Sequence, residues 1–156
     1  MLKMICFDMD GTIADLYAVE GWLQMLRAED ATPYQEAEPM WDMTALAEVL
    51  MLAKANGIEV RIVTWLSMDS TEDYKNAVRK AKREWCERVG FPYDVFHGVQ
   101  YGATKADSVR RYLEDGDTAI LIDDNAKVRN GWHLGGTIDP TACDLIETLR
   151  ALVMGE

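Results

Sequence analysis

The sequence predicts an α/β protein: a three-layer, Rossmann-like parallel sheet with helices on both faces and a minimal cap insertion. Two observations lead to this prediction. Short apolar runs alternate with longer amphipathic segments along most of the chain, as strands and helices do in a parallel sheet. In addition, three of the apolar runs end at the polar side chains Asp8, Thr64 and Asp123. Ligands of parallel sheets bind beyond the carboxyl ends of the strands, so these three side chains are expected at one edge.

The first expected elements lie in the N-terminal half. Residues Leu2 to Phe7 form a short apolar run that stops at an acidic, glycine-containing turn, which is typical of a buried strand. Residues 45–55 carry apolar side chains at helical spacing, and Gly57 stands where a C-terminal cap belongs. The run from Ile58 to Val63 is rich in β-branched residues, which predicts a second buried strand with the Thr64 hydroxyl at its tip.

The C-terminal half continues the alternation. A long helix is expected from about Ser70, with one apolar stripe facing the core. Its other side carries the basic residues Lys75, Arg79, Lys82 and Arg83, and there a solvated face is expected in preference to an anion-binding one. Residues Asp94 to Val99 predict a third strand and Lys105 to Leu113 a helix. A fourth strand is expected from Thr118 to Ile122, directly before Asp123, Asp124 and Asn125.

The segment from Leu16 to Met43 does not fit this alternation. It has a helical stretch near Tyr17 to Arg27, followed by a turn-rich piece with Pro33 and Pro39. At 156 residues the chain has the size of one ordinary domain. We therefore expect residues 1–156 to form a single domain in which about 16–43 is a small cap-like insertion over the site.

Composition narrows the classes of partner. The net charge of −11 would repel a polyanion at long range, so a nucleic acid polymer is an unfavourable partner and a small anion held by a metal ion is favoured. Three scattered cysteines without ligand spacing indicate reduced thiols. No signal peptide or membrane span is visible, so the expected location is the cytoplasm, without a membrane partner.

Asp8 and Asp10 carry the first chemical signal. They lie two residues apart at the end of a strand, so the pleat can aim both carboxylates at one point while Met9 points away. A carboxylate can act as a nucleophile toward phosphorus and form an aspartyl-phosphate. An isolated Asp-x-Asp-Gly also occurs in surface turns and calcium sites, so the assignment depends on the residues expected beside it.

The same predicted edge offers the other groups that phosphoryl transfer needs. Thr64 can donate to a phosphate oxygen, and Lys105 supplies a positive charge. Mg²⁺ takes one or two carboxylates together with waters and a substrate oxygen, which suits Asp8 and Asp123. Trp65 directly follows Thr64 and is expected either to border the pocket or to pack in the fold.

With these residues in place, the sequence resembles the haloacid dehalogenase (HAD) superfamily. Its four motifs match Asp8-Met9-Asp10-Gly11-Thr12, then Thr64, then Lys105, then Asp123-Asp124. The resemblance implies that Asp8 is nucleophile and metal ligand, that Asp10 is general acid and base, and that Thr64 and Lys105 hold the phosphate. It also implies a Mg²⁺ ion bound by Asp8, the Asp10 carbonyl and Asp123, with Asp124 in support.

The resemblance also narrows the reaction. An acid at position 10 is similar to the phosphatase and phosphomutase branches, so a phosphatase acting on a small phosphate monoester is expected. Only about fifty residues separate the first two motifs, which resembles small capless members of the deoxynucleotidase-like or phage-associated type. A nucleoside monophosphate or a similar small monoester is the expected substrate, with its non-reacting part contacted by Trp65 and the 16–43 insertion. Lys127 or Arg129 remains an alternative to Lys105 as the phosphate-binding base.

Two other functions use similar residues. A signalling receiver also combines an acidic pair, an acceptor aspartate, a hydroxyl and a lysine on a parallel sheet. In receivers the acidic pair comes first in the chain, whereas here Asp123 and Asp124 come last. A catalytically idle relative that only binds phosphate is the second alternative. The oligomeric state is not predicted by the sequence.

Overall fold

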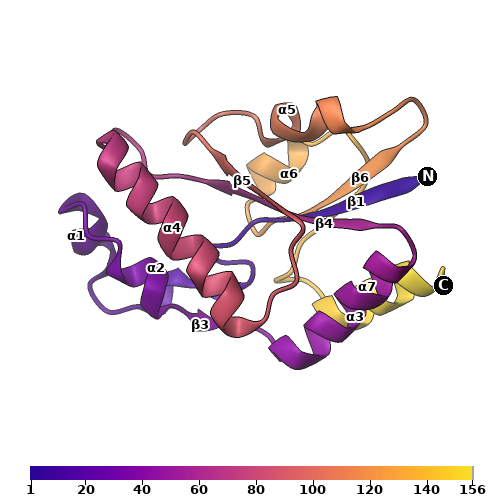
Figure 1. Ribbon diagram of the computed structural model, residues 1–156, viewed down its shortest axis with the longest axis horizontal. Coiled ribbons are helices and arrows are strands. Elements are labelled where there is room, and N and C mark those ends of the chain that lie inside the picture. The colour runs from indigo at the N-terminus through magenta and orange to yellow at the C-terminus, as the bar shows by residue number, and fades with distance from the viewer. Residues whose placement is uncertain (156) are drawn as a thin grey trace.

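The structure is a computed structural model that describes residues 1–155, and a five-stranded parallel sheet forms its centre (Figure 1). The strand order is β5–β4–β1–β6–β7, and each neighbouring pair is parallel. The strands are β1 (Leu2–Phe7), β4 (Glu59–Trp65), β5 (Val95–Val99), β6 (Thr118–Ile122) and β7 (Thr137–Ile138). Parallel neighbours require crossover connections, and helices make most of them, so the carboxyl ends of the strands meet at one edge.

Helices cover both faces of this sheet. One face carries α3 (Met43–Ala55), α4 (Glu72–Val89) and α7 (Leu145–Met154), and the other carries α5 (Lys105–Val109) and α6 (Ala126–Asn130). Alternation along β1 produces this division, because Ile5 and Phe7 pack toward the first group while Met4 and Cys6 pack toward the second. The three-layer α/β prediction is confirmed.

Between β1 and α3, residues 14–39 lie beside α4 and form a small subassembly. It comprises a 3₁₀ turn (Leu16–Ala18), α1 (Trp22–Arg27) and α2 (Thr32–Glu36), and the strands β2 (Ala14–Asp15) and β3 (Glu38–Pro39) pair antiparallel at its base. Two aromatic side chains of α4 attach it. Trp85 Nε1 donates to the Ala37 carbonyl at 2.7 Å, and the Tyr74 hydroxyl donates to the Asp30 carbonyl at 3.2 Å. The insertion is therefore anchored to the helix that also backs the site.

Several element bounds differ from the sequence predictions. Strand β4 continues through Thr64 and Trp65, because parallel pairing extends to Trp65 opposite Val99. The helix expected from Lys105 to Leu113 is regular only to Val109 and tightens into a 3₁₀ turn at Arg110–Tyr112. Strand β7 and helix α7 were not predicted. Strand β7 has only two residues, too few to give an alternation pattern.

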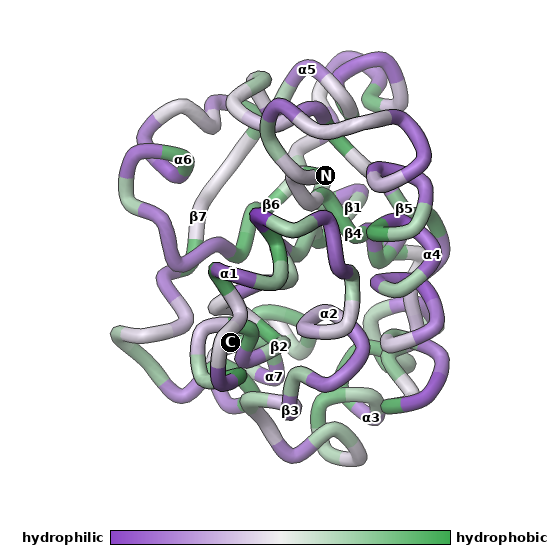
Figure 2. Tube along the Cα trace, turned by 90° about the vertical axis from the view of Figure 1, so that its left-hand side faces the viewer, coloured by the Kyte–Doolittle hydropathy of each residue, from purple (hydrophilic) through white to green (hydrophobic). Residues whose placement is uncertain are grey.

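The hydropathy of the chain follows these layers. In Figure 2 the inner strands contain many of the green, hydrophobic segments, whereas purple, hydrophilic segments lie mainly on loops and outer helix faces. Within residues 1–155, no helix combines the length and the apolar character needed to cross a bilayer.

Candidate active site

The turn that follows β1 positions two carboxylates at the edge of the sheet. The amides of Thr12, Ile13 and Ala14 all donate to the Met9 carbonyl, which folds the chain back tightly. The turn passes through Gly11 at φ +80°, a left-handed conformation that glycine adopts without strain. Met9 is buried in the core, whereas Asp8 and Asp10 line a cavity. This is the arrangement expected from the pleat of the strand.

Lys105 joins the first and last acidic residues. Its Nζ donates to Asp8 Oδ1 at 2.9 Å and to Asp123 Oδ2 at 2.8 Å, and all three side chains are buried. Lys105 is the first residue of α5, whereas Asp123 directly follows β6. The ammonium therefore links groups 97 and 18 residues away in sequence.

Thr12 makes a second link across the same edge. Its hydroxyl lies 3.2 Å from Asp8 Oδ2 and 3.2 Å from Asp124 Oδ1, and it accepts from the Asp124 amide. Asp123 Oδ1 accepts from the Asn125 amide at 2.9 Å. One ligand oxygen from each of Asp8, Asp123 and Asp124 lies within 4.8 Å of the others. These three carboxylates form a group able to hold a metal ion.

The electrostatics of this group show a concentration of negative charge. Burial and the nearby Asp8 carboxylate raise the pKa of Asp124 to about 7, and the same two causes raise the pKa of Asp123 above its usual range. Burial alone would lower the pKa of Lys105, but the charges of Asp8 and Asp123 outweigh it and raise that pKa. The lysine is therefore held as an ammonium between two carboxylates.

Asp10 has a different partner, which sequence reasoning missed. Its Oδ2 accepts at 3.0 Å from Lys82 Nζ, which also donates to Thr64 Oγ1 at 2.7 Å and to the Trp65 carbonyl at 2.9 Å. Lys82 was expected on a solvated helix face, and this expectation was wrong because the side chain is 0% exposed. Its spacing carried a signal: Lys82 is four residues after Val78 and three before Trp85, on the apolar stripe of α4.

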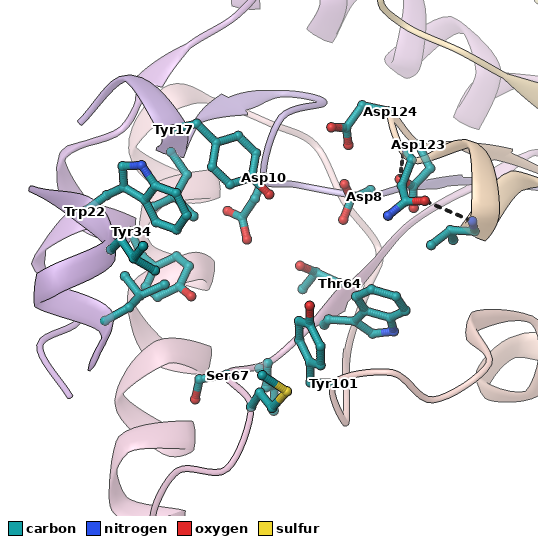
Figure 3. Close-up of a pocket in the computed structure, with 18 of the residues that line it drawn as sticks. Asp8, Asp10, Tyr17, Trp22, Tyr34, Thr64, Ser67, Tyr101, Asp123 and Asp124 are labelled. Atoms are coloured by element: carbon teal, nitrogen blue, oxygen red, sulfur yellow. Dashed lines mark hydrogen bonds between the residues drawn. The ribbon is translucent and has the colours of Figure 1, made fainter. Parts of the chain in front are cut away.

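A cavity of about 450 Å³ opens in front of these groups. In Figure 3 Asp8, Asp10 and Thr64 lie in its middle, with Tyr17, Trp22 and Tyr34 of the insertion on the left and Tyr101 below Thr64. The predicted residues that line it are Asp8, Asp10, Thr64, Trp65, Lys105, Asp123 and Asp124. The structure thus brings together every residue that the sequence selected for the site.

Trp65 belongs to one wall of this cavity and is held on several sides. Its Nε1 donates to the Ala103 carbonyl at 2.9 Å, and its ring centroid lies 5.0 Å from that of Tyr101. Lys105 Nζ lies 5.4 Å from the same ring, within cation–π range. Trp65 therefore both supports the loop after β5 and presents part of its surface to the cavity.

The two alternatives to Lys105 lie elsewhere. Lys127 is exposed on α6. Arg129 donates to the backbone carbonyl of Asp123 at 2.9 Å and lies 3.4 Å from Asp139, so it supports the turn after β6 from outside the cavity. Among the cavity-lining residues that the structure describes, only Lys105 and Arg27 are cationic.

Sequence reasoning did not assign roles to Thr12, Tyr17, Trp22, Tyr34 or Tyr101. Thr12 stands inside the acidic turn, and its hydroxyl, which can both donate and accept hydrogen bonds, was a signal for a role in the site. The four aromatic residues come from two segments far apart in the chain, so no spacing pattern relates them to one site.

Comparison with known proteins adds information on the fold. No protein-family model matches the sequence, and no curated protein matches it as a relative. The chain is similar to one in the structure of the Pnkp1/Rnl/Hen1 RNA repair complex, with a TM-score of 0.57 and 18% identity. That match covers 89% of this chain and 44% of the other, so this chain spans less than half the length of that protein.

Two further solved structures are similar at lower scores. One is a HAD-like phosphatase, described as putative, from Mesorhizobium loti, with a TM-score of 0.46, 18% identity, and coverage of 97% of this chain and 87% of the other. The other is D,D-heptose 1,7-bisphosphate phosphatase from Burkholderia thailandensis, with a TM-score of 0.47, 14% identity, and coverage of 98% and 97%. At 18% identity, the likeness to the chain of the RNA repair complex shows a shared fold alone, so the chemistry of this chain is inferred from its own residues.

Proposed function

We propose that this chain is a magnesium-dependent phosphatase of the HAD type, which hydrolyses a phosphate monoester through an aspartyl-phosphate on Asp8. One observation carries the proposal. The Asp8 carboxylate lies at the cavity with one oxygen bonded to Lys105 and the other to Thr12, beside Asp123 and Asp124. Such an arrangement supplies an aimed nucleophile, a fixed positive charge and a set of metal ligands at one point.

The proposed hydrolysis has two steps, transfer of the phosphoryl group to Asp8 and hydrolysis of the aspartyl-phosphate. In the first, an Asp8 oxygen forms a bond to phosphorus while the bond from phosphorus to the leaving oxygen breaks, and Asp10 gives its proton to that oxygen. In the second, water attacks phosphorus and passes its proton to Asp10, and the bond to Asp8 breaks to release phosphate. Lys105 and the Thr64 hydroxyl hold the phosphoryl oxygens during both steps.

The residues present fit a divalent cation. Four carboxylates, those of Asp8, Asp10, Asp123 and Asp124, are paired with only two ammonium groups, Lys82 and Lys105, which leaves two negative charges uncompensated when all four are ionised. Oxygen ligands of this kind suit Mg²⁺. Asp8, Asp123 and Asp124 would hold it, with the Asp10 carbonyl as the further ligand. When bound, the ion would neutralise charge on the phosphoryl oxygens.

The order of the groups favours this function over a receiver. The acceptor Asp8 follows the first strand and the acidic pair follows the fourth of the long strands, the reverse of the order in receivers. A cavity of about 450 Å³ in front of Asp8 also leaves room for the leaving group of a small monoester. An idle phosphate-binding module would keep the same fold and is distinguished by the experiment below.

The aromatic walls of the cavity suit a leaving group that carries a planar ring, and we propose a nucleoside monophosphate as the substrate. Tyr17 and Trp22 pack edge to face at 5.0 Å on one side, and Trp65 and Tyr101 form the other wall. Rings on both sides suit a planar base. Apart from Lys105, the lining described here has only the exposed Arg27 as a cation, which favours a substrate with a single phosphate.

The test is a screen of the purified protein against phosphate monoesters, nucleotides included, with and without Mg²⁺. The unmodified chain should hydrolyse at least one monoester in the presence of Mg²⁺. Asp8→Asn should abolish this turnover, because an amide neither attacks phosphorus effectively nor binds magnesium as well. Asp115→Asn, which changes an exposed carboxylate, is the matched control and should keep full activity. Retention of more than about 1% of the rate by a folded Asp8→Asn variant would exclude the nucleophile, since loss of a nucleophile removes several orders of magnitude.

A further inference from the structure

Lys82 is a buried charge that the chemistry above does not use. It is among the largest fully buried side chains, and its helix α4 backs the site and anchors the insertion. Burying an ammonium is unfavourable unless it is fully hydrogen-bonded. An aliphatic side chain at this position of the apolar stripe would avoid that penalty, so packing alone does not account for a lysine here.

The three bonds of Lys82 use all of its donors. An ammonium has three N–H groups and no acceptor, and its three partners are Asp10 Oδ2, Thr64 Oγ1 and the Trp65 carbonyl. The Tyr34 ring, 4.9 Å away, covers the same group from the insertion. Each partner belongs to the cavity lining, whereas Lys82 itself does not line the cavity. Lys82 can therefore affect the cavity only through the residues that it holds.

These bonds have a directional consequence for two of the three partners, Thr64 and Asp10. Because Lys82 can only donate, the Thr64 hydroxyl must accept from it, and the single hydrogen of that hydroxyl is left to point elsewhere. The cavity is where a phosphate oxygen would receive it. In the same way, Asp10 is held through Oδ2, which leaves Oδ1 free to exchange a proton with the leaving group or water. One buried ammonium thus orients two groups that both line the cavity.

We propose that Lys82 is a positioning residue that aligns Asp10 as acid and base and sets Thr64 as a donor to phosphate. The proposal rests on the proposed phosphatase function. Lys82 thus has a role in the chemical step, although it contacts neither the substrate nor the oxygens that would bind the metal.

The experiment compares Lys82→Met with Lys80→Met. Methionine has a similar length and removes all three bonds, and Lys80 is an exposed lysine of the same helix whose loss changes net charge equally. We expect Lys82→Met to lower kcat/KM for alkyl phosphates about 100-fold, the lower end of what general acid–base catalysis contributes. The loss for aryl phosphates, which need little protonation on departure, should be about tenfold smaller. Lys80→Met should match the unmodified chain on both.

A double-mutant cycle tests whether Lys82 acts through Asp10. In an Asp10→Asn background, adding Lys82→Met should no longer discriminate alkyl from aryl phosphates, because the acid that it positions is already absent. Equal losses on both substrate classes in the single variant would overturn the proposal. A loss from Lys82→Met that is still larger for alkyl than for aryl phosphates in the Asp10→Asn background would overturn it as well. If Lys82→Met does not fold, Lys82→Arg takes its place, because it keeps the charge but cannot reproduce the three bonds of an ammonium.

A structural measurement separates this proposal from the proposed function. In a crystal structure of the Lys82 variant, the Asp10 and Thr64 side chains should leave the positions that they occupy here. If they stay in place, Lys82 does not position them, whatever the activity. If instead the unmodified chain turns over no monoester, the phosphatase function fails independently of where those side chains lie.

Discussion

Replacing Gly11 by alanine should disturb the metal site through a contact that can be worked out from the structure. A Cβ at this position would lie 2.5 Å from Asp124 Oδ2 and 3.1 Å from Tyr17 Cε2, so the Asp124 carboxylate must move. The backbone is also at φ +80°, where a side chain costs about 1–2 kcal/mol. That strain corresponds to a Tm lower by roughly 2–8 °C for a chain of this size. Displacing Asp124 should weaken Mg²⁺ binding by about 10–100-fold.

Gly57→Ala is the matched control for this variant. Gly57 has φ +82°, but nothing lies within 4 Å of its added Cβ, so the control carries the same backbone strain without the contact to Asp124. Thermal unfolding and a Mg²⁺ titration, by calorimetry and by activity, should be run on both variants. The two should lose similar thermal stability, and only Gly11→Ala should lose metal affinity. Equal Mg²⁺ affinity in both would refute the placement of Asp124 at the metal.

Three further outcomes are expected. Chelation with EDTA should silence the enzyme and Mg²⁺ should restore it, while beryllium fluoride or aluminium fluoride should inhibit by occupying the phosphoryl position; full activity in chelator would exclude the mechanism. Trp65→Ala should raise KM for nucleoside monophosphates roughly 5- to 150-fold with little change in kcat, and should leave KM for small alkyl phosphates nearly unchanged. Its Tm should also fall, because the bond to Ala103 is lost; an unchanged nucleotide KM in the folded variant would remove Trp65 from the substrate site. His97 has a pKa lowered to about 4 by burial and by the charges of Arg61 and Arg111, so the unfolded chain binds its proton first as pH falls from about 6.5. The stability that neutral His97 contributes is fully present above about pH 6.5 and is lost as pH falls toward about 4. Between pH 7 and pH 5, Tm should therefore fall less in His97→Gln than in the unmodified chain.

The His97 prediction has a geometric basis as well. Its Nε2 lies 3.0 Å from Arg61 Nη1, and because a guanidinium only donates, the ring nitrogen must accept. Protonation would turn that acceptor into a donor facing a positive charge. An equal fall in Tm for both proteins would show that His97 is not held neutral by the fold.

The sequence by itself was sufficient for four of the five strands of the sheet and for the polar residues where three of them end. Buried parallel strands are near-continuous apolar runs, so β1, β4 and β6 could be recognised from local pattern, and with them the polar residues at their ends. Since carboxyl ends of parallel strands meet at one edge, the predicted proximity of Asp8, Thr64 and Asp123 required no further information.

Only the tertiary structure decided which partners those residues have. Lys82 was predicted to be solvated because a charged side chain on a helix usually is, and whether it is buried depends on the docking of α4 behind Asp10 and Thr64. The aromatic wall of Tyr17, Trp22 and Tyr34 likewise depends on how the insertion packs against α4. Strand ends are set by short-range periodicity along the chain, whereas the partner of a buried charge is set by long-range packing between elements, which no local pattern encodes.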